Sequence, residues 1–328
     1  MALLNPAETL PAGSRDALEI FDERYLMAIG AVQPQTWASE LGEVSTTPSL
    51  ETKYPMTMLS LKYIEARDQR GKFKTIGERI VDLTVAEYSD GVEVELVKLL
   101  ANAYVARQWA DAPARLLQAE QQFVLRTLAD MLVANSETCG WDGLTLFNDA
   151  HPCNPTEAGS ATFDNLQATT KDVANLANIE AEITAMLEVL DENGDPLNIV
   201  PDTIIVPRQK WQSLRNLLKQ DFVPTPAGTA TMRNPYNDSV LNVVRANQLS
   251  DNNDWYLADS AMISQGIVPW TAQKLQLPSP GFDELGLRRY EPANSDRARE
   301  KGVVGVDSHI YWGFKFLFPH AMRKIAGA

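Results

Sequence analysis

The sequence predicts an α+β fold in which a long β-ribbon and a long helix accompany a layer of alternating helices and strands. Apolar residues recur at every second position on both sides of a polar glycine turn, which predicts a two-stranded ribbon over residues 52–87. Helical apolar spacing runs from residue 113 to residue 134. Between residues 175 and 257 helical and strand patterns alternate, which is typical of an α/β layer arrangement.

The first 50 residues are expected to form an N-terminal arm. Pro6 and Pro11 interrupt any regular pattern at the start, and Ser14 can cap a short helix. The apolar face of that helix carries Leu18, Phe21, Tyr25 and Ile29. Because Gln33-Pro34-Gln35 ends the helix, we expect this face to pack on a distant part of the core or on a neighbouring subunit.

The predicted ribbon is basic, although the chain as a whole is acidic. From Lys53 to Arg79 there are seven Lys or Arg and three acidic residues, so this segment carries +4 in a chain of net charge −14, and the remainder carries −18. Its turn, Arg67-Asp-Gln-Arg-Gly-Lys72, is a polar glycine sequence that suits a hairpin. The basic residues that we expect at an intersubunit contact are Lys62, Arg67, Arg70, Lys72 and Lys74.

The residues alone leave two interpretations of the ribbon open. It is either a solvated hairpin with a charged tip or an intersubunit clasp whose positive face lies on a negative neighbour, since electrostatic complementarity sets register and partner choice. A strand of about twelve residues reaches ~40 Å. A two-stranded ribbon is marginally stable by itself in water, which favours support from another molecule. A nucleic-acid-binding ribbon is less favoured, because the ribbon carries few aromatic residues, with Tyr63 and Phe73 the two nearest its turn.

In the residues that follow the ribbon, the spacing of apolar side chains predicts helices. Ser89-Asp-Gly91 reads as a turn and cap, and residues 92–109 have helical apolar spacing. Pro113 can occupy the first turn of the longer helix that runs to residue 134. Residues 140–159 are rich in Gly, Pro, Asn and Asp, which predicts a loop.

In the rest of the chain, predicted helices are followed by predicted strands. Helices are expected over residues 175–190 and 208–220, with a turn over residues 191–196 between the first helix and a buried strand at residues 203–206. Further strands are expected at residues 241–245, 255–257, 283–290 and 308–318. Gly313, inside the last of these, predicts a bend or a bulge.

Composition and charge limit the function classes. The chain of 328 residues is 45% hydrophobic and 22% charged, which is ordinary for a globular protein. Its net charge of −14 argues against general nucleic-acid binding and against an anionic membrane surface. It suits a protein that stays soluble at high concentration, or an inner wall that repels packed DNA. Two cysteines fit a reducing cytoplasm, and neither a secretory signal nor a membrane-spanning run is recognised.

No cofactor or metal motif is found, so we predict a protein that is not an enzyme. Gly71-Lys72 lacks the first glycine and the Ser or Thr of a phosphate-binding loop. Asp191, Asn193 and Asp195 alternate as in a calcium loop, but Pro196 stands where that loop needs glycine, so a plain turn is expected.

The cysteines and histidines leave one enzymatic function open as an alternative. The spacing of Cys139, Cys153 and His151 matches no zinc pattern. A nucleophilic pair of Cys153 and His309 stays open, and it would make the protein a soluble hydrolase.

Four segments, which follow one another between residues 143 and 313, carry more specific motifs. They are Gly143-Leu-Thr-Leu-Phe-Asn-Asp-Ala-His-Pro152, the turn and strand of residues 191–207, Ser250-Asp-Asn-Asn-Asp-Trp-Tyr-Leu-Ala-Asp259, and Asp307-Ser-His-Ile-Tyr-Trp-Gly313. In the first, a Leu-Phe pair is followed within a few residues by His-Pro. Together these segments resemble the major head subunits, or major capsid proteins, of Mu-like tailed bacteriophages.

This resemblance implies a Hong Kong 97-type capsid fold with five parts. They would be the N-terminal arm at residues 1–50, the extended loop at 51–88, a peripheral domain with a long spine helix at 89–158, an axial α/β domain at 159–281, and a C-terminal return to the peripheral domain at 282–328. The extended loop corresponds to the basic ribbon, so the resemblance favours the intersubunit clasp.

The resemblance also implies a function. Such proteins self-assemble as hexamers and pentamers into an icosahedral shell around double-stranded DNA, with portal, scaffold and cement proteins as further partners. The location would be the virion capsid, assembled in the host cytoplasm. Some relatives crosslink through a Lys of the extended loop and an Asn, but no residue here identifies that chemistry. An encapsulin-type compartment of the same fold, which holds cargo enzyme, is the second alternative besides the hydrolase.

Overall fold

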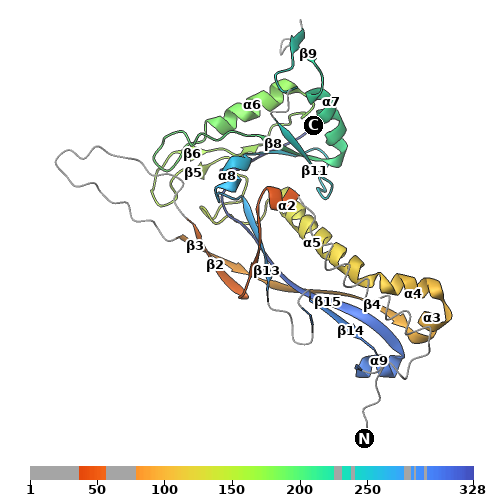
Figure 1. The fold of residues 1–328 in the computed structure, drawn as a ribbon. Coiled ribbons are helices and arrows are strands. Elements are labelled where there is room, and N and C mark those ends of the chain that lie inside the picture. The colour runs from red at the N-terminus through yellow and green to blue at the C-terminus, as the bar shows by residue number, and fades with distance from the viewer. Residues whose placement is uncertain are drawn as a thin grey trace.

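The computed structural model describes residues 37–56, 79–224, 231–237, 241–276, 282–283, 286–291 and 294–328. An α/β unit lies at one end of the molecule, and a long sheet with a long helix beside it runs away from that unit (Figure 1). The observed elements are therefore both helical and β, as the α+β prediction requires. None of the helices in the described part of the chain is long and apolar enough to cross a membrane.

The long sheet is built around one strand, β15. Its strand order is β1-β13-β15-β14, with β4 also paired to β15. The strands are β1 (Glu43–Thr47), β4 (Ala86–Glu95), β13 (Trp270–Leu275), β14 (Leu287–Tyr290) and β15 (Val303–Phe316). The pairing of β4 with β15 is antiparallel and continuous from Val303↔Glu95 to Trp312↔Ala86. Strands far apart in the sequence therefore form the elongated part of the molecule.

A 23-residue helix, α5 (Ala112–Ala134), lies along this sheet. Pro113 stands in its first turn, and Asn135 ends it in the left-handed conformation at φ 47°. Glu120 fixes the helix to the sheet, because its carboxylate accepts a hydrogen bond from Trp312 Nε1 at 2.9 Å and pairs with Lys274 Nζ at 2.6 Å. The predicted helix over residues 113–134 is confirmed.

The helix predicted over residues 92–109 is wrong in its first part. Residues 86–95, including the predicted turn at Ser89–Gly91, belong to strand β4. Two short helices follow, α3 (Leu96–Ala101) and α4 (Ala103–Ala110), and they are separated at Asn102, whose backbone is extended. Residues 86–95 pair with the long strand β15 and therefore form a strand. Their local pattern fits a helix or a strand, and the tertiary pairing decides between the two.

The α/β unit contains a second five-stranded sheet, in the order β11-β8-β12-β16-β7. Its strands are β7 (Leu166–Gln167), β8 (Thr203–Pro207), β11 (Asn242–Ala246), β12 (Trp255–Ala258) and β16 (Met322–Ile325). Both β8 and β12 are buried along their whole length, as their apolar sequences predict. The strands expected near residues 203–206, 241–245 and 255–257 are confirmed within one or two residues.

Three helices and two small strand pairs complete this unit. They are α6 (Leu176–Leu187), α7 (Arg208–Leu218), α8 (Ser260–Ser264), β5 (His151–Pro152) with β6 (Thr162–Phe163), and β9 (Phe222–Pro224) with β10 (Thr231–Arg233). Asn175 caps α6 by accepting a hydrogen bond from the Ala177 N–H. The predicted turn at residues 191–196 is confirmed, because the Asp191 N–H donates to Asp195 O at 2.8 Å.

The C-terminal segment divides between the two sheets. Strand β15 lies in the long sheet, whereas β16 pairs with β12 and β7 in the α/β unit. Helix α9 (Asp296–Lys301) lies at the far end of the long sheet (Figure 1). Residues 282–328 therefore connect both ends of the molecule.

Two elements lie at the junction of the sheets. Helix α2 (Trp37–Glu40) precedes β1, and Trp37 contacts Trp270 edge to face with ring centroids 5.9 Å apart. Strands β2 (Glu51–Met56) and β3 (Arg79–Thr84) pair antiparallel, from Glu51↔Thr84 to Met56↔Arg79. This confirms an antiparallel ribbon at its base, while residues 57–78 lie outside the described part of the chain.

Candidate assembly surfaces

The base of the ribbon is the first candidate surface. The five predicted contact residues, Lys62, Arg67, Arg70, Lys72 and Lys74, lie outside the described residues. In the described return strand Val81, Leu83 and Val85 are buried, whereas Asp82 and Thr84 are exposed. The predicted period-two alternation of this strand is therefore confirmed, and it fixes which face of the ribbon base is turned to the core.

Two glycines allow the ribbon base to sit close to the core. A Cβ atom at Gly313 of β15 would lie 2.6 Å from Leu83 Cδ2 and 2.9 Å from Thr84 O. A Cβ at Gly140 would collide with the Val81 side chain. The bend or bulge predicted at Gly313 is wrong, because the pairing with β13 continues through it, from Lys274↔Trp312 to Gln273↔Gly313 and Ala272↔Phe314. Close approach of β3 is the reason for glycine at this position.

Hydrogen bonds join the ribbon base to β1. The Tyr54 hydroxyl donates to Glu43 Oε2 at 2.9 Å, and the hydroxyls of Thr47 and Thr52 lie 2.7 Å apart. Burial, together with the neighbouring Glu43 carboxylate, raises the pKa of Tyr54 well above its ordinary value. Tyr54 therefore stays a neutral donor, and the ribbon leaves the body of the subunit from a fixed base.

A buried polar cluster lies in the loop predicted over residues 140–159. Asp142 is its centre: Cys139 Sγ donates to Oδ1 at 3.0 Å, and His151 Nδ1 lies 2.7 Å from Oδ2. His151 Nε2 lies 3.1 Å from Leu146 O. Cys139, Asp142 and His151 offer three ligand atoms within 4.8 Å of one another, a set that could hold a metal ion. The hydrogen bonds among these three side chains satisfy their buried polar atoms and hold the loop in one conformation, which is a sufficient structural role for the cluster.

Neither cysteine is in a nucleophilic environment. Burial, and then the hydrogen bond to Asp142 and its charge, raise the pKa of Cys139 to about 12. Burial and the negative charge of Asp191 raise the pKa of Cys153. Both effects keep the thiols protonated, which is the opposite of what a thiolate nucleophile needs.

The predicted pair of Cys153 and His309 is not brought together. His309 lies on β15, where its Nδ1 is 2.8 Å from Glu87 Oε1 of β4. Cys153 follows β5 and donates its backbone N–H to Ala161 O at 2.7 Å. The third histidine, His320, is fully buried, and this burial lowers its pKa to about 3. The described residues therefore contain no Cys–His dyad of the predicted kind.

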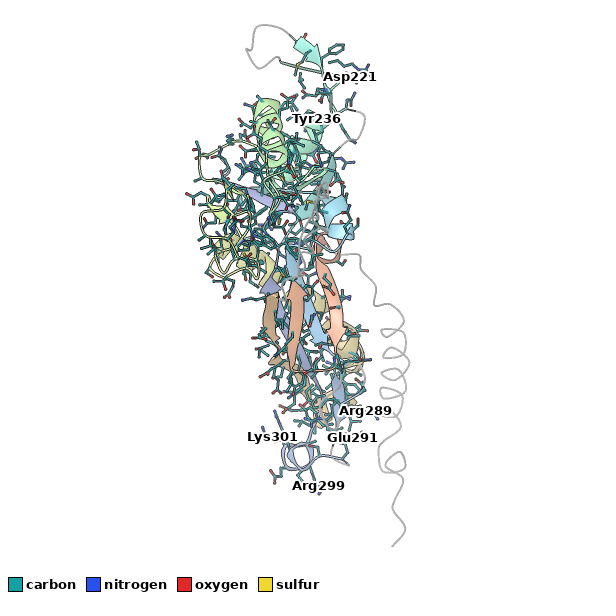
Figure 2. All side chains as sticks on the ribbon, turned by 90° about the vertical axis from the view of Figure 1, so that its left-hand side faces the viewer. Asp221, Tyr236, Arg289, Glu291, Arg299 and Lys301 are labelled. Carbon is teal, nitrogen blue, oxygen red and sulfur yellow. The ribbon has the colours of Figure 1, made fainter. Side chains whose placement is uncertain are left out.

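The far end of the long sheet is a second candidate surface, and its charges are mostly paired. Arg288 Nη2 lies 2.6 Å from Asp307 Oδ2, and Arg297 Nη2 lies 2.6 Å from Glu93 Oε2. Figure 2 shows Arg289, Glu291, Arg299 and Lys301 at this end of the molecule, with Asp221 and Tyr236 at the opposite end. Mixed, paired charges of this kind give a polar surface that carries no single sign.

Exposed apolar side chains form a third candidate surface, on α3 and α4. Val97 is 74% exposed, Tyr104 is 67% exposed, and Leu100 is 38% exposed. Val97 and Leu100 are three residues apart on α3, so they share one helix face. The sequence pattern does not predict this surface, because apolar residues in a helical pattern usually face the core.

The family model described as "Phage capsid protein" matches residues 79–325, about three quarters of the chain. No curated protein matches the sequence.

Solved phage structures have a similar fold. The capsid of cyanophage P-SCSP1u is similar over 91% of this chain and 90% of its own, with a TM-score of 0.54 and 12% identity. A chain of Microbacterium phage Oxtober96 is similar over 90% of this chain and 93% of its own, with a TM-score of 0.51 and 11% identity. The procapsid of bacteriophage JBD30 has a TM-score of 0.50 at 15% identity, over 97% of this chain and 77% of its own. Identities this low establish a likeness of fold.

Proposed function

Because this chain belongs to the phage capsid protein family, whose members are structural proteins that assemble into shells, we propose that it is the major capsid protein of a Mu-like tailed bacteriophage. It assembles as hexamers and pentamers into an icosahedral head that encloses double-stranded DNA. The observation that carries the proposal is the family match over residues 79–325, together with the cyanophage capsid and the Microbacterium phage chain, whose folds align over 90% or more of this chain. The protein acts in the virion capsid, after assembly in the host cytoplasm.

The five-part division of a Hong Kong 97-type subunit belongs to this proposal. It assigns residues 1–50 to the arm, 51–88 to the extended loop, 89–158 and 282–328 to the peripheral domain, and 159–281 to the axial domain. The antiparallel β2–β3 pair supports the extended loop, and the 23-residue helix α5 supports a spine helix. Because β16 pairs with β12 and β5 pairs with β6, we place residues 322–325 and 151–158 with the axial domain instead.

The partners belong to the proposal as well. The main partner is the protein itself, and the extended loop residues Lys62, Arg67, Arg70, Lys72 and Lys74 contact the neighbouring subunit. Portal, scaffold and cement proteins complete the head, and packaged DNA is a non-specific partner that the shell encloses. The net charge of −14 supports a wall that repels DNA rather than one that grips it.

Electron microscopy of the purified chain tests the proposal, since closed shells are expected. Analysis of particles from producing cells separates the two shell functions: double-stranded DNA supports a phage head, whereas shells that hold only a protein cargo indicate an encapsulin-type compartment. A stable monomer on gel filtration, with an activity that Cys153→Ser abolishes, would overturn both.

A further inference from the structure

Charge is distributed unevenly along the α/β unit. From Glu137 to Asp202 the sequence contains thirteen Asp or Glu and a single basic residue, Lys171, which gives this segment a net charge of −12. The next segment, from Arg208 to Arg245, contains six Lys or Arg and two Asp, for a net charge of +4. The change of sign coincides with strand β8, which separates the two segments along the chain.

In the folded α/β unit, the acidic and the basic segment lie at opposite edges of the sheet. The strand order β11-β8-β12-β16-β7 places β11, from the basic segment, at one edge and β7, from the acidic segment, at the other. Helix α7 contacts β8 and β11. In Figure 1 the loops around β5 and β6 lie on the left of the unit, whereas α7 and β11 lie on the right.

The basic edge presents an ordered stripe of cations. Arg208, Arg215 and Lys219 are exposed, and their spacing of seven and then four residues puts them on one face of α7. Arg245 of β11 is also exposed, and its guanidinium lies over the Trp211 ring, as does that of Arg215.

The acidic edge is built from loops that the fold gathers. Asp149 and Glu157 flank β5 and are exposed, and Glu188 is exposed at the end of α6. The turn after α6 lies beside β5, because Asp191 and Glu192 both act electrostatically on Cys153. Within the described residues of this edge, from 137 to 202, Lys171 is the one basic side chain, and it is engaged with the buried Glu182.

We propose that the acidic edge (Asp149, Glu157, Glu188) binds the basic stripe of α7 (Arg208, Arg215, Lys219) on the next copy of the chain. This inference rests on the proposed shell function and deepens it. Two different, complementary surfaces on one subunit make a head-to-tail contact, which closes into a ring when the rotation allows it. Like edges repel, so the charges also select the correct edge and orientation.

Reversing one edge tests the contact. The variant Arg208→Glu, Arg215→Glu and Lys219→Glu makes both edges acidic, and we expect the protein concentration needed for ring or shell formation to rise on the order of tenfold or more. Native mass spectrometry and electron microscopy measure rings and shells, and thermal unfolding shows whether the subunit is intact. If the variant does not fold, the corresponding triple Gln variant replaces it.

A charge swap provides the decisive readout. Adding Asp149→Lys, Glu157→Lys and Glu188→Lys to the reversed stripe exchanges the two edges, and assembly is expected to return. Arg115→Glu with Arg126→Glu, at two exposed positions of α5 that belong to none of the candidate surfaces, is the matched control that adds acidic charge without loss of rings.

Each outcome bears on one claim. A wild-type chain that forms no rings or shells contradicts the proposed function. A wild type that assembles together with a reversed stripe that assembles equally well overturns the contact. A reversed stripe that fails and is not rescued by the swap shows that α7 binds something other than the acidic edge, which also overturns it.

Discussion

At the scale of single residues, Glu182 holds the α/β unit together through charge. It is 1% exposed, and its carboxylate accepts hydrogen bonds from Arg323 Nε at 2.7 Å and from Lys171. Burial by itself raises the pKa of Glu182, but the hydrogen bonds from Lys171 and Arg323 outweigh it, so the pKa lies below its ordinary value. Helix α6, strand β16 and the segment before the helix therefore share one buried carboxylate.

Removing this charge is expected to destabilise the subunit. Glu182→Gln leaves Arg323, which is 4% exposed, without its buried counter-charge, and we expect a loss of about 3 kcal/mol in the free energy of unfolding. Urea unfolding of unassembled subunits measures it. Glu180→Gln, on the same helix but only partly buried, is the matched control and is expected to change stability by less than about 0.5 kcal/mol. Equal effects of the two substitutions would contradict this role.

The same carboxylate predicts a pH dependence. Its pKa is lower in the folded state than in the unfolded state, so its contribution is fully present above the unfolded value, about 4.3, and is lost as the pH falls through the folded value. The stability difference between the wild type and Glu182→Gln is therefore expected to be constant near neutral pH and to shrink below about pH 4. A difference that stays the same down to about pH 3 would exclude the mechanism.

At the scale of elements, the ribbon base depends on a glycine in another strand. Gly313→Ala would place a methyl group 2.6 Å from Leu83 Cδ2 and 2.9 Å from Thr84 O, so β3 has to move away from β15. We expect a loss of about 1–3 kcal/mol, typical of overpacking, and faster amide exchange in β3 than in β12. Adding Leu83→Ala removes one of the two clashes and is expected to recover part of the amide protection of β3. Unchanged exchange in β3 would argue against the close approach.

How far the sequence predicts these elements depends on where the deciding interaction lies. Helix α5 is predicted to within one residue, because its proline start and its apolar stripe are local signals. Residues 92–95 are mispredicted because Val92, Val94 and Leu96 also fit a period of two, and the deciding partner, β15, is some 200 residues away in sequence. The intersubunit residues on the ribbon stay a prediction, since they lie outside the described residues.

The buried cluster of the 140–159 loop shows a second limit. Cys139, Asp142 and His151 meet through a turn, so no period in the sequence connects them. Cys139 and His151 stand out by their rarity, but Asp142, which holds both, is one of many acidic residues. Contacts of this kind become visible only once the backbone path of the loop is known.

At the scale of the whole molecule, both ends and the ribbon base are available for different contacts. The α/β unit occupies one end, and α3, α4 and α9 occupy the other, with the long sheet between them (Figure 1). The β2–β3 base is anchored near the junction of the two sheets through β1 and β15. An elongated subunit with separated surfaces can meet several neighbours at once, which is what a closed shell requires of each copy.

The charge of the ribbon gives the last prediction, for the assembled shell. Arg67→Glu, Arg70→Glu and Lys72→Glu turn the local +4 into −2, in a chain whose remainder carries −18, so attraction to an identical neighbour becomes repulsion. We expect fewer shells at physiological salt, where charges interact over about 8 Å, and an unchanged unfolding temperature of the subunit. The triple Gln variant, which removes the charges without adding repulsion, is expected to lie between the wild type and the Glu variant. Particle counts by electron microscopy measure the effect, and normal shells from the Glu variant at that salt concentration would show that the ribbon charge has no part in assembly.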